Sequence, residues 1–189
     1  MTLDTAFTYF PSLTTNRLLL RQIQAKDAEV LFPIFSDAKA MQFYGHEPHR
    51  SIDDTRELIR QIEGHYARRD SIRWGIALQG EDRLIGTCGF HHFDEEFHRA
   101  ETGYELHRDL WGKGIMTEAM RAILNYGFTE LGLHRVEAII DIANEPSKAL
   151  LLKLGFKYEG NLRERYYFRG RFEDEHYFGL LKDEWQGLV

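Results

Sequence analysis

The sequence has a single cysteine and no long hydrophobic run, and each scarcity excludes a class of protein. Cys88 has no second cysteine with which to form an internal disulfide, which suits a reducing compartment, so we expect a cytoplasmic protein. Because no stretch of about 18 or more apolar residues is present, we expect no membrane span. The N-terminus MTLDTAFTYFPSL lacks a basic segment followed by an apolar run, so no secretory signal is expected.

Acidic residues outnumber basic residues in this chain. The chain carries 24 Lys and Arg residues against 30 Asp and Glu residues, which gives a formal net charge of -6 at pH 7. This balance argues against a general DNA-binding surface and mildly favours a cationic partner. We therefore expect no direct binding to nucleic acid.

What is present suits one globular domain of mixed secondary structure. At 189 residues and 43% hydrophobic composition, the chain can bury a full core, and we expect a single domain spanning 1–189. Hydrophobic periodicity and turn residues predict both strands and helices, in alternation. The expected strands are 17–23, 72–78, 83–93, 100–106, 135–142, 157–167 and 172–181, and the expected helices are 27–36, 51–68, 115–131 and 146–154.

The most informative segment is LWGKGIMTEAM, which places Gly112 and Gly114 at the start of an amphipathic helix. Glycines let the backbone turn sharply and approach a phosphate, while the free amides of a helix start carry partial positive charge. Two better-known phosphate motifs are absent: Lys113 is followed by glycine rather than Ser or Thr, and Thr117 replaces the third glycine of the dinucleotide fingerprint. The segment predicts an anion site built from backbone amides.

Five segments together resemble the GNAT acyltransferase superfamily, and specifically its branch of ribosomal-protein N-terminal acetyltransferases (RimJ/RimL-like). They are TTNRLLLR, AETGYEL, LWGKGIMTEA, NEPSKALLLKLGFKYEG and GRFEDEHYFGLLKDEW, in the order that this branch has them. Asp109 departs from the Arg or Gln that usually begins the family's turn. The resemblance implies an α/β (α+β) GNAT fold, with a mixed, mostly antiparallel central sheet flanked by helices.

The resemblance also implies that acetyl coenzyme A is the acetyl donor and that no metal takes part. The pyrophosphate would lie over the glycine turn, and the pantetheine arm would pair with the strand that ends at Leu106, where a free amide could hold the thioester oxygen. The implied coenzyme-binding residues are Tyr104, Glu105, Leu106, Trp111, Gly112, Lys113, Gly114, Ile115, Met116, Thr117, Asn144 and Ser147. Trp111 has an alternative role as an anchor of the loop in the core.

Ser147 matches the serine that this branch places near the coenzyme sulfur, so we expect it to give a proton to the departing thiolate. Many GNAT enzymes use a tyrosine seven residues after the asparagine at 144, but Leu151 stands there. The alternative is a serine that only caps or solvates the first helical turn.

Two carboxylates are candidates for the base. Glu101 and Glu105 share one face of the expected strand beside the thioester, and we prefer Glu101 because it resembles the family's strand position. The alternative is that both are solvated or form structural ion pairs. An α-amine has a pKa near about 8, against about 10.4 for lysine, so a dedicated base is not essential.

Two other features have ordinary interpretations. The segment GFHHFDEEFH offers His91, His92, Asp94 and His98, but it lacks the H-E-x-x-H spacing, so we expect no metal site there. Cys88 lies in an apolar strand and is expected to pack rather than react.

The expected activity is direct transfer of acetyl from acetyl-CoA to a primary amine, above all the N-terminal amine of a protein such as a ribosomal protein. The helices within 27–68 are expected to form one wall of the acceptor cleft, where Phe43, Tyr44 and Glu47 would meet a peptide. A polyamine or aminoglycoside acetyltransferase and a noncatalytic CoA-sensing module remain alternatives. An RNA- or ribosome-associated factor would need a basic stripe that the sequence lacks. Both a monomer and a homodimer remain open.

Overall fold

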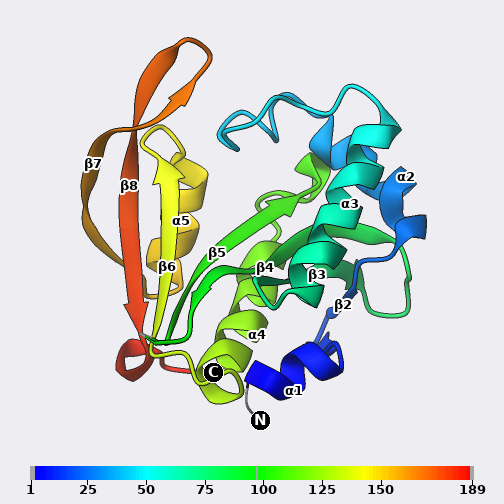
Figure 1. The fold of residues 1–189 in the computed structure, drawn as a ribbon, viewed down its shortest axis with the longest axis horizontal. Coiled ribbons are helices and arrows are strands. Elements are labelled where there is room, and N and C mark those ends of the chain that lie inside the picture. Colours follow the sequence, from blue (N-terminus) through cyan, green and yellow to red (C-terminus); the bar gives the residue numbers. More distant parts are fainter. Residues whose placement is uncertain (1–2, 97, 188–189) are drawn as a thin grey trace.

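The computed structural model describes residues 3–96 and 98–187, and within them one eight-stranded sheet organises the fold (Figure 1). The strand order is β1-β2-β3-β4-β5-β6-β8-β7. Neighbouring strands are antiparallel except β5 and β6, which are parallel. The strands are β1 (Leu13–Thr14), β2 (Leu18–Gln22), β3 (Ser71–Leu78), β4 (Leu84–Asp94), β5 (Arg99–Leu106), β6 (Arg135–Asp141), β7 (Lys157–Phe168) and β8 (Arg171–Leu181). The mixed, mostly antiparallel sheet is confirmed.

Helices flank this sheet, as expected. They are α1 (Leu3–Thr8), α2 (Ala28–Phe35), α3 (Ile52–Ala67), α4 (Ile115–Thr129) and α5 (Glu145–Lys153), with short 3-10 turns at Ala25–Asp27, Arg108–Leu110 and Lys182–Glu184. Each expected strand and helix lies within two residues of its expected bounds. The helix α1 and the short strand β1 were not expected. In the described ranges, no helix is long and apolar enough to cross a membrane.

The two faces of the sheet carry different cores, because successive side chains of a strand point to opposite sides. Trp74 and Ile76 belong to the larger core, which contains the apolar positions of α4 and of α5. The neighbouring residue Ala77 belongs to a second core with α2 and α3. In Figure 1, α2 and α3 lie over the β2–β4 half of the sheet, and α5 lies beside β6 and β8. The helices α4 and α3 thus cover opposite faces.

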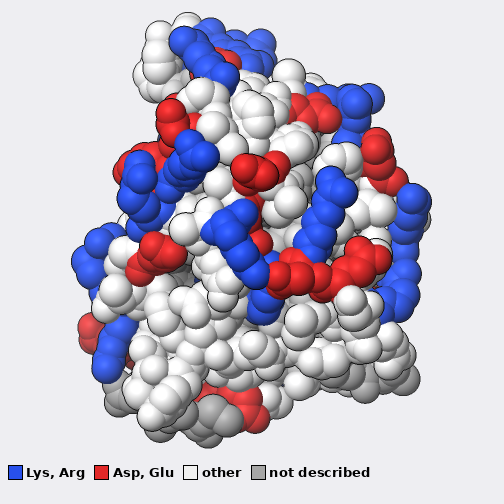
Figure 2. Space-filling model, turned by 90° about the vertical axis from the view of Figure 1, so that its right-hand side faces the viewer, with Lys and Arg blue, Asp and Glu red and all other residues white. Residues whose placement is uncertain are grey.

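The surface on the side of α2 and α3 carries charges of both signs. Figure 2 shows Lys and Arg side chains interspersed with Asp and Glu side chains over this face, rather than gathered into one basic stripe. Such a mixed surface gives no large positive field for a polyanion on this side of the molecule.

The parallel strands β5 and β6 separate after a short paired segment. Their register matches Arg99–Glu101 with residues 135–137, and the pairing ends there although β5 continues to Leu106 and β6 to Asp141. Figure 1 shows the two strands diverging from this point. Beyond Glu101 the edge of β5 is therefore not paired with β6, so its backbone N–H and C=O groups on that edge are available to a ligand.

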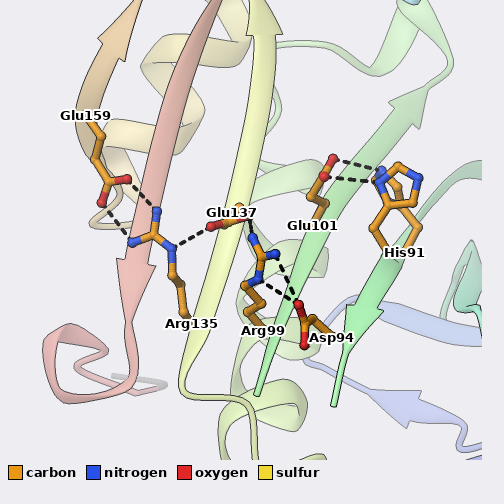
Figure 3. Close-up of polar contacts among 8 residues, drawn as sticks. His91, Asp94, Arg99, Glu101, Arg135, Glu137 and Glu159 are labelled. Atoms are coloured by element: carbon orange, nitrogen blue, oxygen red, sulfur yellow. Dashed lines mark hydrogen bonds and ion pairs between the residues drawn. The ribbon is translucent and has the colours of Figure 1, made fainter. Parts of the chain in front are cut away.

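A chain of ion pairs joins the strands where they are still paired (Figure 3). Arg99 contacts Asp94 at 3.1 Å and Glu137 at 3.2 Å. The other oxygen of Glu137 accepts from Arg135 Nε at 2.7 Å, and Arg135 also pairs with Glu159 on β7. These contacts tie β4, β5, β6 and β7 together at the closed end, so the opening between β5 and β6 lies at the other end.

A second set of polar contacts holds the first turn of α4 against the start of β2. The Glu118 carboxylate accepts hydrogen bonds from Thr15 Oγ1 at 2.6 Å, Arg17 N at 2.9 Å and Arg17 Nε at 2.6 Å. Burial opposes ionisation of Glu118, but these hydrogen bonds outweigh burial and lower the pKa of its carboxyl group. The start of α4 is thereby fixed to the sheet.

Replacing Glu118 with glutamine is expected to lower the free energy of unfolding by about 2 kcal/mol at pH 7, because charge-assisted hydrogen bonds become neutral. The folded-state pKa lies below the ordinary value of 4.5. The ionised carboxylate therefore stabilises the fold above that value, and its contribution disappears as the pH falls through the folded pKa. Urea unfolding of both proteins between pH 3 and pH 7 measures this. An equal difference at every pH would contradict it, and the exposed Glu57→Gln is the control, expected to show no measurable change.

Candidate active site

The turn before α4 has the backbone form that its glycines predicted. Gly112 and Gly114 have φ values of 73° and 72°, in the left-handed region that side chains with a Cβ disfavour. Gly114 is the N-cap of α4, and it supplies no side-chain cap. The first bond of the helix runs from Glu118 N to Gly114 O at 3.1 Å, so the amides of 115–117 precede the helical pattern. These amides lie at the positive end of α4.

Neighbouring side chains hold the turn in place. Arg17 Nη1 donates to the carbonyl of Lys113 at 3.1 Å, and Trp111 Nε1 donates to the carbonyl of Leu106 at 2.9 Å. A Cβ built on Gly112 would meet nothing within 4 Å, so the space above the turn is open. An exposed, braced turn with free amides fits a phosphate-bearing ligand.

A cleft of about 940 Å³ runs from this turn along β5 to the connection between α2 and α3. Phe43 and Tyr44 line it at the far end, whereas Glu47 pairs with Arg169 of the β7–β8 turn at 2.9 Å. Lys113, with an exposed side chain, lies outside the lining. The sequence-predicted site residues that line the cleft are Glu101, Tyr104, Glu105, Leu106, Trp111, Gly112, Gly114, Ile115, Met116, Thr117, Asn144 and Ser147.

Ser147 lies in the first turn of α5 and faces β5. Its hydroxyl oxygen is 2.6 Å from the Tyr104 hydroxyl oxygen, and the residue is buried. The cap of α5 is Asn144 instead, whose side-chain oxygen accepts from Ser147 N at 3.2 Å. Burial raises the pKa of Tyr104 to about 12, so this phenol keeps its proton at neutral pH. The two hydroxyl groups therefore lie together inside the cleft, and the phenol carries its proton.

Glu105 lies on the opposite face of β5 and forms a buried ion pair. Its carboxylate pairs with Arg73 of β3 and accepts from Thr87 Oγ1 at 2.5 Å. Burial opposes the charge of Arg73, but the nearby Glu105 carboxylate outweighs burial and raises the pKa of Arg73. The sequence analysis missed Arg73, although an arginine inside the apolar strand sequence SIRWGIAL was a signal that a buried carboxylate faces it.

Replacing Glu105 with glutamine is expected to reduce the free energy of unfolding by about 3–5 kcal/mol, because the Arg73 charge would remain buried without its partner. Urea unfolding measures the change. The double variant Arg73→Met/Glu105→Gln is expected to lose much less than the sum of the two single variants, since it removes both charges. Additive losses would show that the ion pair does not couple the two strands.

Glu101 lies on the same face as Glu105 but meets two histidines (Figure 3). One carboxylate oxygen is 3.1 Å from His92 Nδ1, and the other is 3.6 Å from His91 Nε2. Burial, followed by the charges of Arg73 and His92, lowers the pKa of His91 to about 4, so His91 is neutral at pH 7. The Glu101 side chain is 23% exposed and lines the cleft, so water or a ligand in the cleft can reach its carboxylate.

The side chains of the histidine-rich segment have different partners in the structure. His91 and His92 gather at Glu101, whereas Asp94 pairs with Arg99 on the neighbouring strand. Cys88 is fully buried in the larger core, as expected of a packing residue, and burial raises the pKa of its thiol.

The gap between β5 and β6 connects the two sides of the sheet. Tyr104 and Ser147 lie on the side of α4 and α5, while Glu101 lies on the side of α2 and α3. One cleft connects both sides. A ligand held by the glycine turn and a second ligand from the α2–α3 side can therefore approach each other through the opening in the sheet.

Comparisons with known proteins agree with this architecture. The family described as acetyltransferase (GNAT) domain matches residues 17–157. The chain is 40% identical to the uncharacterized N-acetyltransferase YoaA of Bacillus subtilis, covering 92% of this chain and 98% of YoaA. It is 33% identical to the putative ribosomal N-acetyltransferase YdaF of the same organism, over 94% of this chain and 98% of YdaF.

A relative with a different named acceptor also matches. The spermidine N(1)-acetyltransferase of Escherichia coli is 26% identical, over 82% of this chain and 81% of the relative. Among solved structures, a GNAT-family acetyltransferase from Bacillus anthracis superposes with a TM-score of 0.83 at 30% identity, covering 92% of this chain and all of that one. The matched family and the relatives show that this chain belongs to the GNAT family of N-acetyltransferases.

Proposed function

We propose that this acetyltransferase modifies the N-terminal amine of a protein, such as a ribosomal protein, by direct transfer from acetyl-CoA in the cytoplasm. The observation that supports direct transfer is the single cleft that connects the two faces of the sheet at the β5–β6 opening. Two ligands that meet there need no covalent enzyme intermediate. The matching putative ribosomal acetyltransferase supports the protein acceptor.

In this proposal the backbone holds the donor. The amides at the start of α4 and the turn at Gly112 and Gly114 bind the pyrophosphate, and no metal is required because the helix start supplies positive potential. The edge of β5 at Tyr104–Leu106 hydrogen-bonds the pantetheine arm, since it lacks a β6 partner there. Asn144, whose side-chain oxygen caps α5, lines the same cleft and contacts the arm through its amide nitrogen in this proposal.

The chemistry then needs two proton movements. The acceptor amine forms a C–N bond to the acetyl carbon while the C–S bond breaks, and Ser147 gives its proton to the leaving thiolate. Tyr104 can return a proton to Ser147 across the 2.6 Å contact, and water in the cleft then reprotonates Tyr104, whose raised pKa favours the neutral phenol. Glu101 takes the excess proton of the new amide nitrogen through water, and we assign this role to Glu101 alone because Glu105 is held by Arg73.

A small amine is the second candidate acceptor, because the 26% identical relative is a spermidine acetyltransferase. Purified protein would be given acetyl-CoA with peptides that differ in their first residue, and separately with spermidine, spermine and an aminoglycoside. Mass spectrometry of the products gives kcat/KM for each acceptor. A value at least about tenfold higher for a peptide is the expected result. A preference for a polyamine would overturn the protein acceptor, and saturable coenzyme binding without turnover would support a sensing module.

A further inference from the structure

We propose that His91, His92 and Glu101 form a binding site for a borderline divalent metal ion such as Zn²⁺ at the acceptor end of the cleft. We further propose that an ion bound there inhibits acetyl transfer. The binding proposal stands on the geometry of these three side chains. The inhibition rests on the proposed role of Glu101.

The ligand atoms are near the separations that zinc requires. Zn–N and Zn–O bonds of about 2.0–2.1 Å in a tetrahedron place two ligand atoms roughly 3.3 Å apart. One Glu101 oxygen lies 3.1 Å from His92 Nδ1, and the other lies 3.6 Å from His91 Nε2. With one ligand atom taken from each residue, the three atoms lie within 4.8 Å of one another. Two imidazoles and one carboxylate are a recurrent three-ligand set for zinc, which leaves a fourth position open.

The backbone has an unusual conformation that creates this arrangement. Consecutive residues of a regular strand point to opposite faces, so two adjacent histidines would be kept apart. The pairing of β4 with β5 becomes irregular between His91 and Asp94, and His92 has a φ of 50°. His91 already faces Glu101, because the two residues are paired across the β4–β5 ladder. The left-handed conformation of His92 brings the second imidazole to the same carboxylate. Strained backbone in a non-glycine residue is concentrated at functional sites.

The position of the site predicts the effect of an ion. Glu101 and His91 line the cleft, whereas His92 is 72% exposed at its rim, so an ion can enter from solvent. An ion that binds the Glu101 carboxylate occupies the lone pairs that would accept a proton. Its charge also repels an incoming ammonium group. Zinc at this site is therefore expected to slow transfer without displacing the coenzyme at the glycine turn.

The binding test uses Co²⁺ as a spectroscopic probe with protein freed of metal by a chelator. The wild type is expected to bind one equivalent with visible absorption bands of a low-symmetry, four- or five-coordinate site, and Zn²⁺ should remove the bands. His92→Asn should lower Co²⁺ affinity at least tenfold, because asparagine tolerates the same left-handed backbone but removes the imidazole. His134→Ala, a change at an exposed histidine on another segment, is the control and should bind as the wild type does. Equal affinity in His92→Asn, or no saturable binding, would overturn the site.

The inhibition test compares the rate of each zinc-treated protein with the rate of the same protein free of metal. The acetylated peptide is measured by mass spectrometry, because zinc binds the free coenzyme thiol and would disturb an assay that detects this thiol. Saturating Zn²⁺ should reduce the wild-type rate at least tenfold, and His92→Asn should need at least tenfold more Zn²⁺ for the same reduction. Full activity of the zinc-loaded wild type would overturn the inhibition while leaving the site intact. If no amine is acetylated, the Co²⁺ titration still decides whether the ion binds.

Discussion

Replacing Gly114 with valine is expected to weaken coenzyme A binding by at least about 100-fold, measured by isothermal titration calorimetry. Gly114 has a φ of 72°, which a β-branched residue adopts only with strain of about 1–3 kcal/mol. The side chain would also stand among the amides that are proposed to face the pyrophosphate. The turn would move to a conformation that a Cβ accepts, and the amides at the start of α4 would lose their common direction.

The matched control is Gly132→Val at the other end of the same helix. Gly132 also has a φ of 72°, and a Cβ there would meet nothing within 4 Å. Both variants should therefore lose similar stability in thermal unfolding, but Gly132→Val should bind coenzyme A as the wild type does. Normal affinity in Gly114→Val would mean that backbone amides at this turn do not hold the coenzyme.

The elements that the sequence predicted well are those whose signals are local. The helix α4 begins after a glycine turn and has a continuous apolar face, and Ser51 with Asp54 forms a capping box at the start of α3. The helix α1 has no comparable signal. It is held by a distant contact, because Tyr66 of α3 donates a hydrogen bond to the carbonyl of Ala6 at 2.7 Å.

The candidate site divides in the same way. The glycine turn was predicted from adjacent residues, and most of the residues implied by the family resemblance do line one cleft. The partners of those residues come from strands far away in the sequence. The arginine in SIRWGIAL signalled a buried carboxylate, but the sequence did not identify Glu105 as its partner. No local pattern indicated that Tyr104 would reach Ser147, since both contacts depend on how distant elements pack. The left-handed backbone of His92 could not be predicted from the sequence either, because it accompanies irregular pairing between β4 and β5.

Replacing Ser147 with alanine is expected to lower kcat by about 100-fold while leaving the dissociation constant of coenzyme A nearly unchanged. A positioned general acid contributes roughly 10²–10⁴ to a rate, and water reaching the cleft can replace part of this. The measurements are steady-state kinetics with the best peptide and calorimetric titration with coenzyme A. A loss confined to kcat indicates an interaction made in the transition state rather than in binding.

Two further variants separate this role from helix capping. Ser51→Ala removes a serine that caps α3 away from the cleft, so it should lower stability by about 1 kcal/mol without changing kcat. Tyr104→Phe keeps the ring but removes the hydroxyl that lies 2.6 Å from Ser147, so it should lower kcat by a smaller factor than Ser147→Ala. If Tyr104 passes its proton through Ser147, adding Tyr104→Phe to Ser147→Ala should cost little more, because the relay is already broken. Unchanged kcat in Ser147→Ala would instead assign the proton to water or to Tyr104 directly.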